Sequence, residues 1–257
     1  LQEYAGRYPS QNKAAASLAG ISAATFSALI NGKYELISDE MFRRIDAQIG
    51  VQRNDEWVLC DTTLFRELSL TMRDAQDYAN VAWAISPAGS GKTTTARAYA
   101  AANGNVFMVS CSEDMSLRAA LERVTQYLLT LDRPLLVFDE GDKLPDSVFY
   151  YFITIYNRLE GRCGMVFIST HYIRRRMDIG LSYNKKGYDE IHSRICRKFV
   201  ELTPANEYEI AAVARANGLS DDKAVRAVLK DAAACAFDMR RAKREIHKQR
   251  RLAALRS

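Results

Sequence analysis

The sequence is poor in the residues that build disulfide frameworks, zinc sites and membrane spans. It contains 5 Cys, 5 Pro and 3 His in 257 residues, without a C-x-x-C pair. This pattern argues against structural zinc and against a disulfide scaffold, and it fits a reducing cytoplasm. No run of about 18 apolar residues is present, so we expect no membrane span. The first nine residues lack the basic and apolar regions of a secretory signal.

The charge of the chain is distributed unevenly. The formal net charge is +5, but residues 215–257 hold twelve Lys and Arg against five Asp and Glu, a net charge of +7. The rest of the chain is therefore slightly acidic, at −2. Such asymmetry predicts a polyanionic partner, and the alternative is a solvated helix face.

The first of three segments, 1–55, has a helical pattern. Ala16 and Ala19 are small enough for two helices to approach closely, and Gly20 permits a bend between them. Ser22 is placed to cap the second helix, which has an apolar face of Phe26, Leu29 and Ile30 and ends at Asn31-Gly32. The pattern predicts a helix-turn-helix domain.

The exposed positions of the predicted recognition helix are Ser22, Thr25 and Ser27. None of them is an Arg, Gln or Asn, the side chains that read base edges best. We therefore expect weak contact with DNA of any sequence, and the alternative is a helical docking domain that touches no DNA.

The second segment, 56–205, alternates helices with apolar strands. Continuous apolar strands separated by helices predict an α/β fold with a parallel sheet covered on both faces. The expected strands are 81–86, 106–110, 135–139 and 165–169, and the expected helices are 62–79, 93–102, 116–131 and 149–159.

The third segment, 206–257, is expected to be helical throughout. Asn206 and Glu209 have the spacing of a capping box. Ser220-Asp221-Asp222 predicts the start of the next helix. The strongly basic part of the chain lies in this segment.

A phosphate-binding loop is predicted directly after the strand 81–86. The sequence Ser86-Pro87-Ala88-Gly89-Ser90-Gly91-Lys92-Thr93-Thr94 continues into a helix. In a P-loop, backbone N–H groups surround the phosphates, the Lys reaches the β- and γ-phosphates, and the Ser or Thr hydroxyl binds Mg²⁺. Lys92 and Thr93 meet these needs, whereas Ser86 replaces the first glycine. We expect residues 87–94 to bind ATP.

Two adjacent acids end the strand 135–139. Asp139 would reach the Mg²⁺ shell together with Thr93, and Glu140 would orient the attacking water. The P-loop lies about 47 residues upstream of Asp139. The acidic pair predicts an active ATPase that hydrolyses ATP to ADP and phosphate.

The strand 165–169 ends in Thr170-His171 and resembles the sensor-1 strand of AAA+ ATPases. The resemblance places His171 where the family usually has Asn, and Thr170 is the alternative sensor. His192-Ser193-Arg194 resembles the element that provides the AAA+ arginine finger, with Arg197 as the competing residue.

The resemblance to AAA+ ATPases extends along 81–242. Phe237-Asp238-Met239-Arg240-Arg241 is similar to the sensor-2 motif, in which Arg240 would contact the γ-phosphate from a helical lid. Phe237 departs from the family, which usually has Gly there. The resemblance implies an AAA+ P-loop core at 56–205, a small all-α helix-turn-helix domain at 1–55 and a basic C-terminal helical lid at 206–257.

A helix-turn-helix in front of an AAA+ core is similar to the transposition regulators of the phage Mu B type, and less closely to TnsC and the IstB loaders. This resemblance implies ATP-dependent assembly on double-stranded DNA as a ring or filament, with little sequence preference. It also implies a partner transposase, which provokes hydrolysis, and a role in DNA transposition and integration in a bacterial or phage-infected cytoplasm.

A basic loop is expected between sensor 1 and the arginine finger. Lys and Arg mixed with Tyr and Asn suit contacts with DNA phosphates, and the alternative is a solvated loop. The candidate DNA contacts are Arg174, Arg175, Arg176, Lys185 and Lys186.

Two further functions compete with the transposition regulator. One is a helicase-loading or remodelling ATPase whose first domain docks a protein. The other is a phage-type repressor with a vestigial nucleotide domain, which the intact Lys92, Asp139 and Glu140 argue against.

Overall fold

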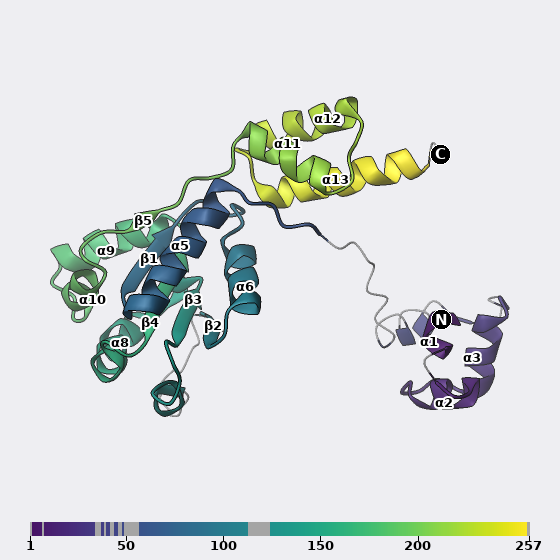
Figure 1. Ribbon diagram of the computed structural model, residues 1–257, viewed down its shortest axis with the longest axis horizontal. Helices are drawn as coiled ribbons and strands as arrows, with labels where there is room; N and C mark the ends of the chain where they lie inside the picture. The colour runs from purple at the N-terminus through teal and green to yellow at the C-terminus, as the bar shows by residue number, and fades with distance from the viewer. Residues whose placement is uncertain are drawn as a thin grey trace. The chain divides into compact units, whose positions relative to one another are not determined.

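The chain divides into two compact units, Leu1–Trp57 and Val58–Ser257, which are described separately. The structure is a computed structural model (Figure 1). It describes residues 2–6, 8–33, 37–38, 40–41, 44–45, 48, 57–112 and 124–255. The expected boundary between residues 55 and 56 lies outside these residues, and the division into three domains stays a prediction.

The first unit contains three short helices, α1 (Gln2–Ala5), α2 (Gln11–Ala16) and α3 (Ala23–Ile30). Ser22 caps α3 as expected, because its Oγ accepts a hydrogen bond from the N–H of Thr25 at 3.0 Å. Ala14, Ala15, Leu18, Phe26 and Leu29 form its apolar centre. The helix α3 is thus confirmed, while the helix-turn-helix assignment stays a prediction.

The second unit is built on a five-stranded parallel sheet in the order β2-β3-β4-β1-β5. The strands are β1 (Val81–Ile85), β2 (Val106–Ser110), β3 (Leu135–Asp139), β4 (Gly164–Ser169) and β5 (Val200–Glu201). The sequence predicted the first four and missed the two-residue β5. Because β1, β3 and β4 are neighbours with parallel directions, their carboxyl ends meet at one edge.

Helices cover both faces of the sheet, as expected for strands that are apolar throughout. Helices α5 (Thr63–Tyr78) and α6 (Lys92–Ala102) pack on the face that includes Leu135 and Val137. The opposite face is covered by α8 (Asp146–Leu159), α9 (Tyr172–Ser182) and α10 (Tyr188–Arg194). There Trp83 stacks on Phe167 with ring centroids 4.6 Å apart.

Three helices form the lid, α11 (Glu207–Ala216), α12 (Asp222–Ala233) and α13 (Met239–Ala254). The capping box of Asn206 and Glu209 is present, and Asp221 caps α12, so both expectations are confirmed. The three helices contact one another (Figure 1). Their buried apolar residues are Ile210, Val213, Ala214, Val225, Val228, Ala232, Ala242 and Ile246.

The expected basic loop after sensor 1 is wrong, because residues 172–182 form the helix α9. Ile173, Met177 and Gly180 recur at helical spacing and are buried, a signal that the interleaved arginines obscure. The expected helix 116–131 lies partly outside the described residues. Among the helices that are described, none is both long enough and apolar enough to cross a membrane.

Candidate nucleotide site

The loop between β1 and α6 has the backbone of an anion-binding turn. Gly89 and Gly91 have φ values of +76° and +102°, which L side chains rarely adopt. Gly91 occupies the N-cap position of α6, and no side chain caps the helix. The first N–H groups of α6 are therefore available to an anion, and the helix dipole favours negative charge at this end. Ser90 is buried beside these glycines, whereas Pro87, Ala88 and Thr94 are exposed.

Lys92 lies inside this loop and is only 8% exposed. Its Nζ donates hydrogen bonds to the carbonyl of Ser86 at 2.8 Å and to that of Pro87 at 2.7 Å. Burial lowers the pKa of Lys92 to about 8, although Asp139 and Asp142 act in the opposite direction. A phosphate beside Nζ would stabilise the ammonium, so the loop fits a polyphosphate.

The acidic pair lies at the end of β3. Asp139 is 8% exposed, and its Oδ1 accepts a hydrogen bond from the N–H of Glu140 at 3.1 Å. Glu140 has a left-handed backbone, with φ of +58°. Such a conformation costs a non-glycine residue about 1 kcal/mol or more and is common at functional sites. The Oε2 of Glu140 is 2.7 Å from the Nζ of Lys143, an ion pair that sequence reasoning missed.

The residues present fit Mg²⁺ only together with a nucleotide. Thr93 is half-buried in the first turn of α6. Asp139 is the last residue of β3, at the same edge of the sheet. The described residues contain no group of three or more His, Cys, Asp or Glu that could hold a metal ion. Mg²⁺ prefers one or two protein oxygens together with phosphate oxygens and water, which this donor set allows.

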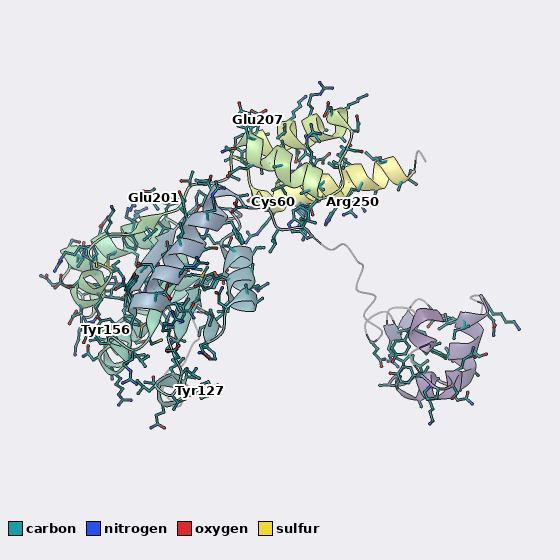
Figure 2. The ribbon with its side chains drawn as sticks, viewed as in Figure 1. Cys60, Tyr127, Tyr156, Glu201, Glu207 and Arg250 are labelled. Atoms are coloured by element: carbon teal, nitrogen blue, oxygen red, sulfur yellow. The ribbon has the colours of Figure 1, made fainter. Side chains whose placement is uncertain are left out.

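The two candidate sensors at the end of β4 face different neighbours. Thr170 Oγ1 donates a hydrogen bond to Asp142 Oδ2 at 2.8 Å, in the turn that follows Glu140. His171 Nε2 instead lies 3.3 Å from Glu201 Oε1. Glu201 is the last residue of β5 and is labelled in Figure 2. The geometry favours Thr170 as the residue near the acidic pair.

The lid contacts the P-loop through the turn before α13. The N–H of Met239 donates to the carbonyl of Gly89 at 2.9 Å. The carboxylate of Asp238 lies so close to Gly89 that a Cβ on this glycine would overlap it. Arg240 follows Met239 at the start of α13, so the same turn brings it to the P-loop. Sequence reasoning singled out Arg240 and missed the contact between Asp238 and Gly89.

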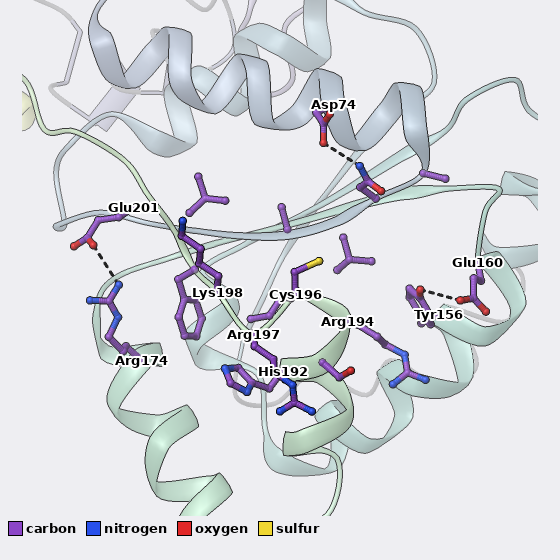
Figure 3. Close-up of a pocket in the computed structure, with 18 of the residues that line it drawn as sticks. Asp74, Tyr156, Glu160, Arg174, His192, Arg194, Cys196, Arg197, Lys198 and Glu201 are labelled. Carbon is purple, nitrogen blue, oxygen red and sulfur yellow. Dashed lines mark hydrogen bonds and ion pairs between the residues drawn. The ribbon is translucent and has the colours of Figure 1, made fainter.

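Arg194 and Arg197 lie apart from the P-loop, in the wall of a cavity of about 1340 Å³ (Figure 3). Arg194 donates to Asn157 Oδ1 at 3.0 Å, and its guanidinium lies 4.6 Å from the centroid of the Tyr156 ring. Arg197 has a φ of +56° and forms an exposed ion pair with Asp189 at 3.1 Å. The cavity is lined by none of residues 86–94.

Most of the predicted DNA contacts near α9 have acidic partners within the chain. Arg174 pairs with Glu201 at 3.3 Å, and Lys185 pairs with Asp146 at 3.1 Å. Arg175 and Lys186 are exposed.

Arg176 is only 16% exposed and is held from three directions. It donates to Asp146 Oδ1 at 2.6 Å, to the carbonyl of Asp142 at 3.0 Å and to the hydroxyl of Tyr188 at 3.1 Å. Burial alone would raise the pKa of Asp146, but hydrogen bonds from Tyr188, Arg176 and Lys185 lower it to about 2. This geometry favours a structural role for Arg176, and DNA contact by this residue stays a prediction.

Comparisons with known proteins identify the fold. No protein-family model matches the chain, and no curated protein matches it by sequence. The structure is similar to the replication initiator DnaA bound to AMPPCP and single-stranded DNA, with a TM-score of 0.51 and 16% identity over 75% of this chain. A weaker similarity, with a TM-score of 0.41 and 13% identity over 60% of this chain, is to Cdc6p from Pyrobaculum aerophilum. At this identity the similarity to DnaA shows the fold alone, which is the P-loop fold of the AAA+ type.

This chain covers 62% of the DnaA chain and 48% of the Cdc6p chain. Both shares are below two thirds, and both identities are low. The predicted AAA+ fold class, with a parallel sheet flanked by helices, is confirmed.

Proposed function

We propose that the protein is a Mg²⁺-dependent ATPase whose active site is the edge formed by the P-loop, the acidic pair and the start of α13. One observation carries the proposal. The buried Lys92 of the P-loop lies at the edge of the sheet where β3 ends in Asp139, and the start of α13 is bonded to the same loop through Met239 and Gly89. A buried cation, an acid and a helix start that meet at one edge match a site that binds a phosphate chain and a cation together.

Each residue has a distinct role in this proposal. Residues 87–94 form the phosphate loop, in which the backbone N–H groups that follow Pro87 hold the phosphates and Lys92 neutralises the β- and γ-phosphates. Thr93 and Asp139 would hold Mg²⁺, and the bound nucleotide supplies the phosphoryl group that is transferred to water. Glu140 orients that water and accepts its proton, which requires its carboxylate to leave Lys143.

Thr170 and Arg240 complete the proposed site. Thr170 lies beside the turn that follows Glu140, and its hydroxyl would be linked to the attacking water through Asp142. Arg240 would contact the γ-phosphate from the lid, and the hydrogen bond from the adjacent Met239 to Gly89 supports this placement. His171 is the weaker sensor candidate because it faces Glu201.

The arginine of α10 is proposed to act on a neighbouring subunit. Arg194 and Arg197 lie in a cavity that includes no P-loop residue, so neither is positioned by these contacts to serve the site of its own chain. Arg194 is the preferred finger because Tyr156 and Asn157 hold its guanidinium in place. A shared site requires a homo-oligomer, either a ring or a helical filament.

We further propose that this oligomer assembles on double-stranded DNA without sequence preference and presents it to a transposase. The support is the +7 charge of residues 215–257 and the resemblance of the domain order to transposition regulators. The DnaA structure, which has a similar fold, contains both AMPPCP and single-stranded DNA. The DNA-contact residues proposed from the sequence remain Arg174, Arg175, Arg176, Lys185 and Lys186.

The proposal is tested by mixing the protein with unrelated duplexes and a non-hydrolysable ATP analogue, followed by electron microscopy. We expect nucleotide-dependent oligomers on every duplex, and none with Lys92→Ala. ATP turnover should rise when DNA is present. Oligomers that require a protein partner but no DNA would favour a loading or remodelling ATPase. Tight binding to one sequence without nucleotide would favour a repressor.

A further inference from the structure

The last helix, α13, carries a row of basic side chains, all of them exposed except the half-buried His247. The row consists of Arg240, Lys243, Arg244, His247 and Arg251, and we call it the basic stripe. These positions follow i, i+3, i+4, i+7 and i+11, which places them on one side of a helix. Ala242, Glu245 and Ile246 are buried against the rest of the lid. At about 1.5 Å per residue, the stripe extends about 16 Å.

Three arginines of the stripe lack the acidic partners that other cations on α13 have. Arg241 forms a two-point ion pair with Asp231, at 2.6 and 2.7 Å, and Lys248 pairs with Glu245 at 3.2 Å. Within the described part of the chain, Arg240, Arg244 and Arg251 form no ion pair. Acidic residues thus neutralise Arg241 and Lys248, whereas Arg240, Arg244 and Arg251 keep their positive charge on one side of α13.

The surface near α9 has the opposite character. Its cations Arg174, Arg176 and Lys185 are each paired with an acid of the same chain. A polyanion that bound there would have to compete with Glu201 and Asp146. Arg240, Arg244 and Arg251 have no such acidic competitor in the described part of the chain, so the stripe is the better phosphate-binding surface.

The residue types of the stripe indicate what it binds. It contains no Phe, Tyr or Trp on which an unstacked base could stack, the usual device for single strands. It contains no Asn or Gln to read a base edge. Long cations repeated along a helix suit the phosphates of an intact duplex, which carries one charge per about 1.7 Å of its axis. A hollow of about 620 Å³ borders the first half of the stripe, between Cys235 and His247.

The end of α13 at which the basic stripe begins lies against the P-loop. Asp238 caps α13 by accepting from the N–H groups of Arg240 and Arg241, at 2.7 and 3.1 Å. The same turn contacts Gly89 through Asp238 and the N–H of Met239. The P-loop is thus in direct contact with the start of the helix that carries the stripe.

We propose that the basic stripe of α13 binds the phosphate backbone of duplex DNA, and that nucleotide at the P-loop fixes the position of the helix for this contact. The inference rests on the proposed ATPase function and deepens it, because it assigns the DNA surface and its link to nucleotide. Arg244 and Arg251 are the phosphate contacts, while Arg240 at the near end serves the nucleotide.

The test compares two double variants with equal loss of charge from the lid. Arg244→Gln/Arg251→Gln removes two cations from the stripe, and Lys223→Gln/Lys230→Gln removes two exposed cations from α12. Gln has a helix propensity close to those of Arg and Lys, so both should fold. Circular dichroism and ATP turnover without DNA check this point.

Binding is measured by fluorescence anisotropy on a labelled random duplex, with a non-hydrolysable ATP analogue, across a salt series. The stripe variant should bind at least about tenfold more weakly than wild type near physiological salt. Its log–log salt slope should be smaller by about 1.8 per subunit, since each phosphate contact contributes about 0.9. The α12 variant should remain within about twofold of wild type.

The outcomes separate this inference from the proposed function. Equal weakening in both double variants would overturn the stripe, because net charge alone would then explain the affinity, and the ATPase proposal would stand. A wild-type protein that hydrolyses ATP but binds no duplex would overturn the stripe and the DNA partner together. A stripe variant with reduced nucleotide affinity and an unchanged salt slope would show that α13 serves only the nucleotide, which also overturns the proposal.

Discussion

The contact between Gly89 and Asp238 makes a quantitative prediction about how the lid is held on the P-loop. Gly89→Ala adds a Cβ at a backbone with φ of +76°, which costs about 1–2 kcal/mol. The same Cβ overlaps the Asp238 carboxylate, which must move away from the N–H groups that it caps on α13. Loss of an N-cap costs about 1 kcal/mol, and loss of the bond from Met239 to Gly89 costs about the same. The expected destabilisation is therefore about 3–4 kcal/mol.

Gly91→Ala is the matched control. Gly91 also has a positive φ, +102°, but no atom lies within 4 Å of where its Cβ would be. Only the backbone cost applies, so we expect a destabilisation of about 1–2 kcal/mol. The difference of about 2 kcal/mol between the two variants measures the contact with the lid.

The assay is urea unfolding followed by the fluorescence of the buried Trp83, in a Trp57→Phe background so that a single tryptophan reports. Asp238→Ala should cost about 1 kcal/mol in the wild-type protein but almost nothing in Gly89→Ala, where the contact is already broken. Equal destabilisation by Gly89→Ala and Gly91→Ala, or additive effects of Gly89→Ala and Asp238→Ala, would refute the reasoning.

Three further predictions concern the arginines and Lys92. Arg194→Ala should retain nucleotide binding and lose about 10³–10⁵-fold in ATP turnover. Mixing it with Glu140→Gln subunits should partly restore turnover at the mixed interfaces. No restoration in verified mixed oligomers would count against a shared site. Arg176→Ala should lower the free energy of unfolding by about 2–3 kcal/mol, because it leaves Asp146 and a backbone carbonyl without this partner. Arg175→Ala should change it by less than about 0.5 kcal/mol in the same urea assay. Because burial lowers the folded-state pKa of Lys92 to about 8, below its ordinary value, ATP affinity should fall as pH rises through about 8, and the unliganded protein should gain stability over the same window. Calorimetry at pH 8.5 in two buffers should show proton uptake on ATP binding, and its absence in wild type would contradict the lowered pKa.

The elements around the P-loop were predictable because each has a strong local signal. The strand β3 was predicted with its observed bounds, and the strand–glycine loop–helix order around Lys92 followed from residue types alone. Parallel strand direction then places the ends of β1, β3 and β4 together without further information. This logic predicted the neighbourhood of Lys92 and Asp139, although their roles stay predictions.

The contacts that the sequence did not predict depend on tertiary packing. Arg176 was grouped with its basic neighbours because its acidic partner, Asp146, precedes it by 30 residues and belongs to another helix. The same limit concealed the docking of Asp238 on Gly89. The helix α9 was missed because two arginines on its solvent side masked the spacing of Ile173 and Met177. Charge patterns along a chain do not reveal which charges pair across the fold.

The account depends most on separate roles for Lys92 and Glu140 at one nucleotide site, and one measurement tests this directly. ATP affinity and single-turnover hydrolysis are measured side by side for wild type, Lys92→Ala and Glu140→Gln. Lys92→Ala should abolish binding, because the loop loses its buried positive charge. Glu140→Gln should bind ATP like wild type and lose turnover, because only the activation of water is removed. Equal loss of nucleotide affinity in both variants, or wild-type turnover in Glu140→Gln, would contradict the account.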